Sequence, residues 1–357
     1  MPPAKRIWTR GRFHASSSLS RPSPVAGETT TPAPASNVSQ TSTLPLALQR
    51  TTDRKPTRRL RHEDYTVGWI CALDIELAAA QEMLDEEHQP LPRDASDPNS
   101  YTLGRVGEHN TVIMVLGLMG TNSAASAVAQ MKSTFTSVQF GVLVGIGGGV
   151  PSAKADIRLG DVVVCWPSKD CGGVIQYDLG KTRPDGVERT GFLNAPPKAL
   201  LSALKSLKAS HLKGSVGFLH HLAKLSSQSL FARDKAGPDI LYDPAYNHEE
   251  EEENCNNCKK EYSVRRQTRG EHVLVHYGTI ASGNQVMRDA KERDKVSEKL
   301  GGVLCFEMEA AGVMNDFPCL PVRGICDYSD SHKNKSWQPF AAGTAAAYAK
   351  ELLLLLP

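Results

Sequence analysis

The chain has 357 residues, of which 40 % are hydrophobic and 22 % are charged, a composition typical of globular domains. The formal net charge is only +2, and no apolar run approaches the roughly 18 residues that span a bilayer, so we expect neither a nucleic-acid-binding nor a membrane protein. Eight irregularly spaced cysteines favour a reducing compartment over a disulfide scaffold, and we expect a cytoplasmic protein.

The first 60 residues differ in composition from the rest of the chain. They contain ten Lys or Arg residues against two acids, a net charge of +8, whereas the remaining residues carry −6. They are rich in Ser, Thr and Pro and show neither helical nor strand periodicity, so they cannot bury enough apolar surface to offset chain entropy. We predict a disordered basic tail over residues 1–60. No acid precedes Glu28, so an organelle transit peptide is the alternative.

From residue 61 onward the sequence predicts strands that alternate with helices. The predicted strands are 65–72, 101–106, 111–116, 140–146, 161–166, 273–282, 303–306 and 321–326. The predicted helices are 75–87 (capped by Asp74), 122–135, 197–207, 286–300, one from residue 309, and 339–355. This alternation favours an α/β domain with a mostly parallel or mixed sheet that is covered on both faces.

Residues 228–272 interrupt this pattern. They contain an acidic run at 249–253, the pair Cys255/Cys258 and a basic stretch at 259–269, and we predict a surface insertion. The Cys-x-x-Cys pair is half of a zinc site, with His248 and His272 as further ligand candidates. Neither histidine belongs to a second paired motif, so two unmetallated thiols are the alternative, and we assign no metal.

Four predicted strand ends carry residues suited to chemistry. They are Ala-Leu-Asp-Ile-Glu at 72–76, Gly-Ile-Gly-Gly-Gly at 145–149, Phe-Glu-Met-Glu at 306–309 and Ile-Cys-Asp at 325–327. Ligands of α/β sheets bind where strands end, and a glycine-rich turn lets backbone approach a ligand. Alone, the acids at 72–76 are better explained as a helix cap and an exposed first-turn acid, and for Asp327 a helix cap or turn residue is the alternative. Because residues i and i+2 point in different directions, we expect only one of Glu307 and Glu309 to face inward.

Five motifs in this order carry a resemblance to a known family. VGWICALDIE, GIGGG, IASGN, FEMEAAG and VRGICD resemble the nucleoside phosphorylase/nucleosidase family over residues 65–355. The longer motifs IQYDLGK, HYGTIASGNQVM and GICDYSDSHKNKSW resemble its fungal branch, in which such domains often precede NOD-like receptor regions. The resemblance implies a three-layer α/β/α fold with a central mixed twisted sheet over residues 61–357, and a homo-oligomer.

The resemblance also implies roles for individual residues. Asp327 matches the acid that protonates or hydrogen-bonds N7 of the leaving purine, and Glu76 matches the base that activates water in nucleosidases. Glu309 matches the residue that binds the ribose hydroxyls. The other expected substrate contacts are Met308 on the sugar, Gly147, Gly148 and Gly149 on the nucleophile side, Val286, Met287 and Asn284 at the base, and Lys333 and Lys335 at a 5′-phosphate.

The choice of nucleophile rests on charge. The loop at 72–76 contains no Arg, and Glu76 would repel a phosphate anion, which favours water. Ile146 stands where nucleosidases often have Ser, a departure from the pattern that leaves the water's position open. We therefore expect hydrolysis of a purine nucleoside or nucleotide, ATP included, without an organic cofactor or catalytic metal. The alternatives are a phosphorylase that uses phosphate and a non-catalytic ligand-sensing module.

Overall fold

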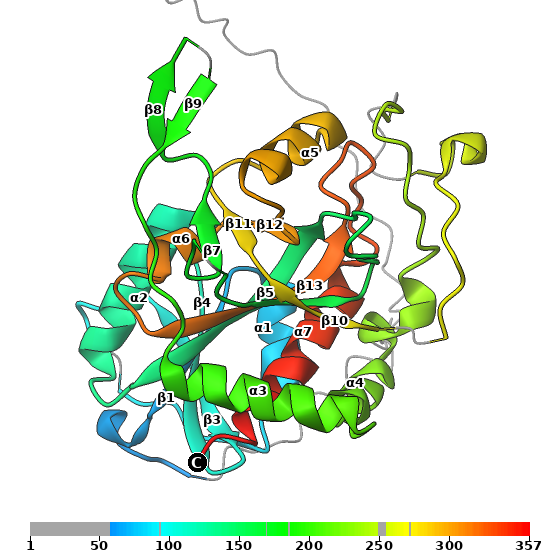
Figure 1. Cartoon of the computed structure of the whole chain (residues 1–357). Helices are drawn as coiled ribbons and strands as arrows, with labels where there is room; N and C mark the ends of the chain where they lie inside the picture. The colour runs from blue at the N-terminus through cyan, green and yellow to red at the C-terminus, as the bar shows by residue number, and fades with distance from the viewer. Residues whose placement is uncertain (1–57, 93, 169, 185, 249–254, 271–272) are drawn as a thin grey trace, which may run out of the picture. The chain divides into compact units, whose positions relative to one another are not determined.

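The computed structural model describes residues 58–357, except for residues 93, 169, 185, 249–254 and 271–272 (Figure 1). The predicted tail therefore lies outside the described residues apart from 58–60. The described helices all lack the length and apolar character needed to cross a bilayer.

A mixed sheet of eleven strands forms the centre of the fold. Its main path runs in the order β10-β6-β13-β5-β1-β4-β3-β2, and β11 joins β7 and β12 beside it. The strands are β1 (Val67–Cys71), β2 (Glu86–Glu87), β3 (Ser100–Val106), β4 (His109–Val115), β5 (Phe140–Gly149), β6 (Val162–Cys165), β7 (Val174–Gln176), β10 (Val275–Gly278), β11 (Ile280–Ser282), β12 (Cys305–Glu307) and β13 (Cys319–Asp327). A separate hairpin consists of β8 (Gly180–Arg183) and β9 (Gly186–Arg189).

Helices cover both faces of this sheet. They are α1 (Asp74–Glu82), α2 (Thr121–Thr134), α3 (Lys198–Leu212), α4 (Phe218–Ser226), α5 (Ala290–Lys299), α6 (Ala310–Val313) and α7 (Gln338–Leu353). A Cβ atom on Gly68 would contact Met131 of α2, whereas one on Gly324 would overlap the backbone of Ala341 in α7. The strand register places these two glycines on opposite faces, so α2 and α7 lie on opposite sides of the sheet. Helix α6 packs with α2, and α1 and α4 pack with α7 (Figure 1).

The strands that lead to the predicted site are fully buried. Every residue of β1 and β13 is buried, because each strand has a sheet neighbour on both sides and helices above and below. Strand β5 runs parallel to both β1 and β13, so the carboxyl ends of these three strands meet at one edge. The expected α/β fold with a mixed sheet is confirmed.

Several predicted boundaries are wrong for local reasons. The first helix ends at Glu82 rather than 87, and Asp74 is its first residue rather than its cap. The fifth helix begins at Ala290 rather than 286, because the side chain of Asp289 accepts hydrogen bonds from the N–H groups of Lys291 and Glu292. The short strands β7, β8 and β9 and helix α4 were not predicted.

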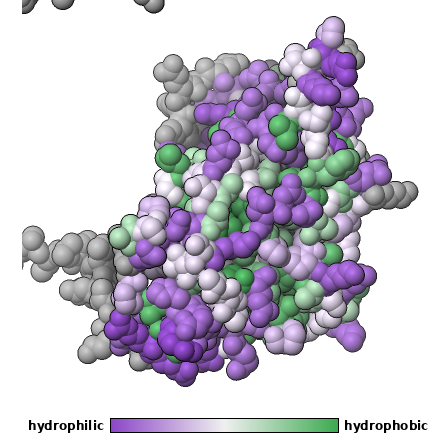
Figure 2. All heavy atoms as spheres, turned by 90° about the vertical axis from the view of Figure 1, so that its left-hand side faces the viewer, coloured by the Kyte–Doolittle hydropathy of each residue, from purple (hydrophilic) through white to green (hydrophobic). Residues whose placement is uncertain are grey.

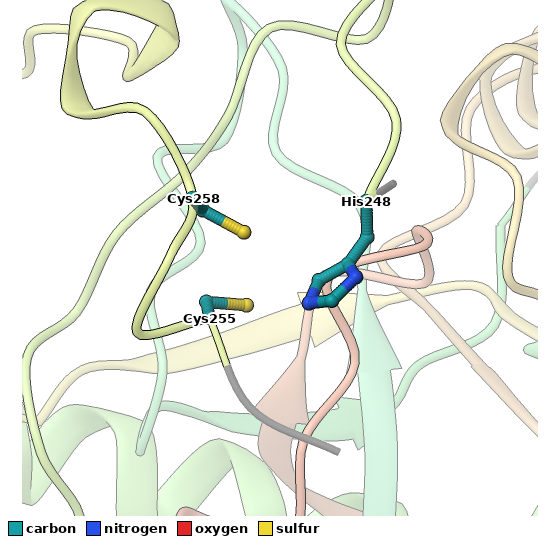
Figure 3. A group of neighbouring side chains, drawn as sticks. All are labelled: His248, Cys255 and Cys258. Carbon is teal, nitrogen blue, oxygen red and sulfur yellow. The ribbon is translucent and has the colours of Figure 1, made fainter. Parts of the chain in front are cut away.

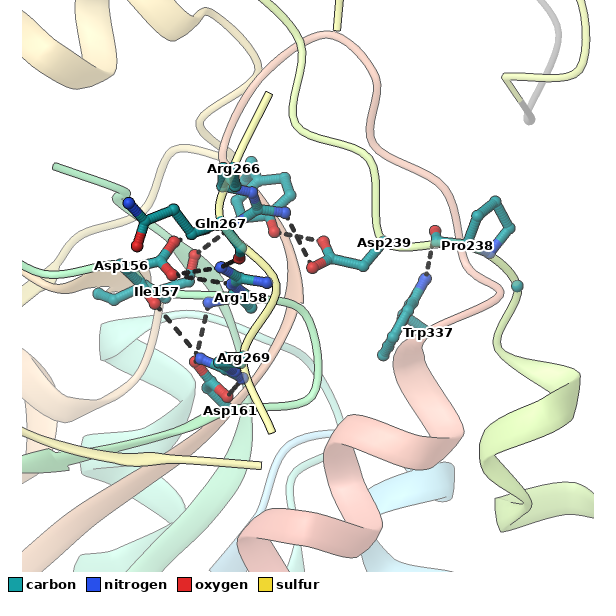
Figure 4. A network of polar contacts seen from close by, with 12 residues as sticks. Asp156, Ile157, Arg158, Asp161, Pro238, Asp239, Arg266, Gln267, Arg269 and Trp337 are labelled. Carbon is teal, nitrogen blue, oxygen red and sulfur yellow. Dashed lines mark hydrogen bonds and ion pairs between the residues drawn. The ribbon is translucent and has the colours of Figure 1, made fainter. Parts of the chain in front are cut away.

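The insertion at 228–272 is held against the sheet domain by charged contacts. Figure 4 shows Arg266, which donates to the carbonyl oxygen of Ile157 at 3.3 Å, and Arg269, which is paired with the fully buried Asp161. The indole N–H of Trp337 donates to the carbonyl of Pro238 at 3.3 Å. The basic stretch is therefore not simply a solvated face, because two of its arginines join the insertion to the rest of the domain.

Apolar side chains also reach the surface. Figure 2, which views the molecule from the side of α2 and the β8–β9 hairpin in Figure 1, shows hydrophobic atoms between hydrophilic margins. Among the described residues, Leu118, Met119 and Val286 are respectively 76 %, 53 % and 49 % exposed. Exposed apolar side chains of this size are a feature of contact surfaces.

Candidate active site

A cavity of about 190 Å³ lies where the carboxyl ends of the central strands meet. All four predicted strand ends contribute to it, although they are far apart in the sequence. Its lining residues are Ala72, Leu73, Glu76, Met119, Ile146, Gly147, Gly148, Gln285, Val286, Met287, Phe306, Glu307, Met308, Glu309, Cys326, Asp327, Ser329, Lys333 and Gln338. Parallel strands that end at the same edge explain why these segments converge.

Glu76 is held rigidly on one side of the cavity. Its Oε2 accepts hydrogen bonds from the N–H groups of Ala72 (2.7 Å) and Leu73 (3.0 Å), and its Oε1 accepts one from Ile146 (2.8 Å). Burial raises the pKa of Glu76, while Arg323 and these N–H groups act in the opposite direction. The carboxylate is thus fixed between the start of α1 and the end of β5, at a position from which it can accept a proton.

Arg323 joins two further glutamates beneath the cavity. Its Nη2 pairs with Glu307 and lies 3.3 Å from Oε2 of Glu309, and all three side chains are buried. The expectation that only one of these acids faces inward is wrong. Glu307 ends strand β12 and Glu309 precedes α6, so they are not two residues of one helix and the chain turns both toward Arg323.

The charges in this cluster do not balance. Three buried glutamates (76, 307 and 309) surround one arginine. Burial alone would lower the pKa of Arg323, but the glutamates raise it, so the guanidinium stays charged. Burial, together with Glu307 and Glu76, raises the pKa of Glu309 to about 7, although Arg323 opposes this shift. When Glu76 and Glu309 are ionised, the cluster presents excess negative charge to the cavity, which suits sugar hydroxyls and a developing positive charge.

The glycines of β5 make room for this cluster. Residues 147–149 continue the strand and pair with β12 and β13, so the expected glycine-rich turn is wrong. A Cβ atom on Gly145 would overlap Arg323 and lie 2.5 Å from Oε1 of Glu76. A Cβ atom on Gly148 would overlap Ser329 and lie 2.6 Å from Oδ1 of Asp327. Close side-chain approach, rather than an unusual backbone conformation, explains why these positions are glycine.

Asp327 lies at the end of β13, on the side of the cavity away from α1. Its Oδ1 accepts a hydrogen bond from the N–H of Ser329 at 2.9 Å, and its Oδ2 lies 2.9 Å from Nζ of Lys333. The thiol of Cys326 donates to Oδ2 at 3.1 Å. Burial would lower the pKa of Lys333, but Asp327 raises it above its ordinary value. The pair thus combines an oriented carboxylate with an ammonium group that stays charged.

Only some of the other predicted substrate residues line the cavity. Met308, Val286, Met287, Gly147 and Gly148 line the cavity. Gly149, Asn284 and Lys335 do not line it. Gly149 packs against Ile157 and Ile325, and Asn284 forms hydrogen bonds with Thr121 and Asp178. Lys335 lines a neighbouring cavity of about 500 Å³. The two cavities share Cys326 and Asp327.

Sequence reasoning assigned no function to Arg323, Glu307 and Ser329. Arg323 is an isolated charge in the apolar strand β13. A charge in a fully buried strand needs a partner, so the sequence pattern could have indicated that Arg323 pairs with an acid. The sequence predicts only that one of Glu307 and Glu309 faces inward. Ser329 has the one positive φ among the described non-glycine residues, 52°, which sequence alone does not reveal.

Comparison with known proteins assigns this geometry to a family. The phosphorylase superfamily matches residues 66–354. The chain belongs to the phosphorylase superfamily. The expected family and the expected enzyme class, a glycosyl hydrolase or glycosyl transferase, are thereby confirmed.

Relatives of this superfamily member come from fungi and bacteria. A nucleotide-binding leucine-rich repeat (NLR)-like protein of Hyaloscypha variabilis is 46 % identical over 314 residues, which are 85 % of this chain and 30 % of that protein. The 5′-methylthioadenosine/S-adenosylhomocysteine nucleosidase of Mycobacterium tuberculosis is 24 % identical, over 82 % of this chain and 97 % of that protein. The present chain thus spans less than a third of its NLR-like relative.

Solved structures share the fold. Futalosine hydrolase of Helicobacter pylori has a TM-score of 0.52 and 16 % identity, over 82 % of this chain and 98 % of that chain. S-adenosylhomocysteine nucleosidase of Streptococcus pyogenes has a TM-score of 0.53 and 18 % identity, over 82 % and 98 %. These likenesses agree with the observed arrangement of helices around a mixed sheet.

Proposed function

We propose that this superfamily member hydrolyses the N-glycosidic bond of a purine nucleoside or nucleotide and releases the free base. The observation that carries the proposal is the convergence of Asp327, Glu309 and Glu76 on one cavity of about 190 Å³. Cleavage of this bond requires an acid for the leaving base, stabilisation of an oxocarbenium-like sugar and a nucleophile on the opposite face. The three carboxyl groups supply one function each.

In the proposed reaction, Asp327 delivers a proton to N7 of the purine, and the ammonium group of Lys333, 2.9 Å away, stabilises the carboxylate that this transfer leaves. Glu309 accepts hydrogen bonds from the ribose hydroxyls, and Met308 packs on the sugar. Glu76 takes a proton from the attacking water. Positive charge that develops on the sugar is stabilised by the negative cluster around Arg323.

Electrostatics support water rather than phosphate as the nucleophile. Lys333 is the only Lys or Arg among the described residues that line the cavity, and it is paired with Asp327 on the base side. Arg323 is engaged by Glu307 and Glu309. A phosphate anion placed beside Glu76 would meet negative charge without a free cation.

The substrate class follows from the relatives and remains part of the proposal. The names of the bacterial relatives refer to methylthioadenosine, S-adenosylhomocysteine and futalosine. Of the two lysines predicted to meet a 5′-phosphate, Lys333 pairs with Asp327 and Lys335 lines the adjoining cavity of about 500 Å³. A nucleotide such as ATP would therefore have to extend its phosphates toward that second cavity.

The test is base release by the purified chain, measured chromatographically with and without phosphate. The substrates are ATP, AMP, adenosine, inosine, methylthioadenosine and S-adenosylhomocysteine. We expect free base without phosphate and a loss of about 100-fold or more in kcat for Asp327→Asn, the usual contribution of a general acid. Asp97→Asn is the matched control, since Asp97 is equally buried but lines a separate cavity.

Other outcomes discriminate between the alternatives. Turnover only with phosphate, together with a sugar phosphate product, would replace the proposal by a phosphorylase. No base release from any of these substrates, in a folded chain that still binds them, would favour a ligand-sensing module.

A further inference from the structure

A second group of reactive side chains lies in the insertion. Figure 3 shows the side chains of His248, Cys255 and Cys258 pointing toward one another. One nitrogen of His248 and the two sulfur atoms all lie within 4.8 Å of one another, and each residue is partly buried. Both cysteines are free thiols.

The geometry of this group fits a tetrahedral metal. Zinc binds thiolate sulfur at about 2.3 Å and imidazole nitrogen at about 2.0 Å, which places its ligand atoms roughly 3.5–3.8 Å apart. The N–H of Cys258 donates to the carbonyl of Cys255 at 3.2 Å, so a tight turn presents both sulfurs on one side. A small inward movement of the three side chains therefore completes three of the four ligand positions.

His332 lies beside this group, although its ring nitrogens are not among the ligand atoms that lie within 4.8 Å of one another. Its ring centroid lies 5.7 Å from that of His248, its side chain is buried, and neither ring nitrogen has a hydrogen-bond partner. A buried imidazole without a partner is costly unless another group, such as a metal, engages it.

The group also touches the loop that follows Asp327. The N–H of His248 donates to Oγ of Ser331 at 2.9 Å, and Sγ of Cys255 lies 3.4 Å from the carbonyl oxygen of His332. This loop carries Lys333, which pairs with Asp327. On the other side of the insertion, Arg266 and Arg269 bind Asp239 and Asp161 (Figure 4).

We propose that His248, Cys255 and Cys258 bind one structural zinc ion, which orders the part of the insertion that contacts the loop at 327–336. Binding releases the two thiol protons, including the one in the present contact between Cys255 and His332. Zinc selects this site over harder cations because two of its ligands are thiolates. The inference does not depend on the proposed reaction, since the metal does not touch the catalytic carboxylates.

The test measures metal content and does not rely on activity. The full chain is purified with a reductant and zinc, dialysed, and analysed by mass spectrometry for metals. We expect about one zinc per chain, and at least a tenfold reduction in Cys255→Ser/Cys258→Ser. Cys171→Ser is the matched control, because Cys171 is also a partly buried free thiol but lies outside the group.

Two further measurements use the native chain and so do not depend on whether a variant folds. Cobalt added to the native chain should give the intense absorption of a tetrahedral thiolate site. Chelation should also speed tryptic cleavage in the basic stretch 259–269 by tenfold or more. Native chain without zinc, unchanged zinc in the double variant, or a Cys255–Cys258 disulfide in the reduced preparation would each overturn the proposal.

Discussion

Arg323 is the residue on which the electrostatics of the site depend. It is the buried cation that Glu307, Glu309 and Glu76 share. A buried ion cluster is retained only while its charges compensate one another, because an unpaired ion in the interior costs several kcal/mol. Removal of Arg323 should therefore leave uncompensated charge in the interior.

Replacement of Arg323 by Met should destabilise the fold by about 3–5 kcal/mol, since it leaves the glutamates without their cation. Chemical denaturation at pH 7 measures this change. Adding Glu307→Gln to the same chain removes one of the uncompensated charges and should recover part of the loss. Equal stability of the single and double variants would show that the pair is not coupled.

The raised pKa of Glu309, about 7, predicts a pH dependence. If the ionised form binds the ribose, kcat/KM should fall as the pH drops below about 7. The free energy of unfolding should change in the opposite sense. Between pH 4.5 and about 7 the native state holds a proton on Glu309 that the unfolded state has released. The contribution of this group to stability therefore falls as the pH rises through this range.

Thermal unfolding of Glu309→Gln measures the second effect. The variant should gain stability relative to the native chain as the pH rises from 5 to 8. A constant difference in melting temperature over this range would contradict the raised pKa.

At the scale of elements, the end of β5 decides the shape of the cavity. Its glycines lie in an extended strand, and the space that their missing side chains leave is filled by Glu76, Arg323, Asp327 and Ser329. A glycine-rich sequence predicted a close approach to the backbone. Only the parallel register with β13 shows that the approaching groups belong to the protein itself.

Gly148→Ala should displace the carboxylate of Asp327 and reduce kcat tenfold or more while the chain remains folded, because the new methyl group would lie 2.6 Å from Oδ1. Gly117→Ala is the control, since a Cβ atom there meets no atom within 4 Å. Base release and circular dichroism are compared for the two variants. Native activity in Gly148→Ala would contradict the proposed position of Asp327.

At the scale of the whole molecule, the cavity is bordered by exposed apolar side chains. Met119 and Val286 line it and are about half exposed, and Leu118 beside Met119 is 76 % exposed. A second copy of the chain that covered this edge would bury these side chains and exclude water from the site. The homo-oligomer expected from the family resemblance stays a prediction, and this edge is the surface that we expect it to cover.

Leu118→Glu should therefore weaken self-association by tenfold or more, as measured by light scattering over a range of concentrations. Leu212→Glu is the control, because Leu212 is 89 % exposed at the end of α3 and does not line the cavity. A native chain that is monomeric at all concentrations would contradict this prediction.

The alternation of strands and helices, the family and the strand ends that carry Glu76, Glu309 and Asp327 could all be predicted from the amino-acid sequence. These are local properties, since hydrophobic periodicity and short motifs are written in adjacent residues. Tertiary structure alone decided that Glu307 and Glu309 both turn to Arg323, that Lys333 meets Asp327 while Lys335 faces another cavity, and that His248 joins Cys255 and Cys258. Each of these contacts depends on strand register and loop course, which bring together residues that no local pattern connects.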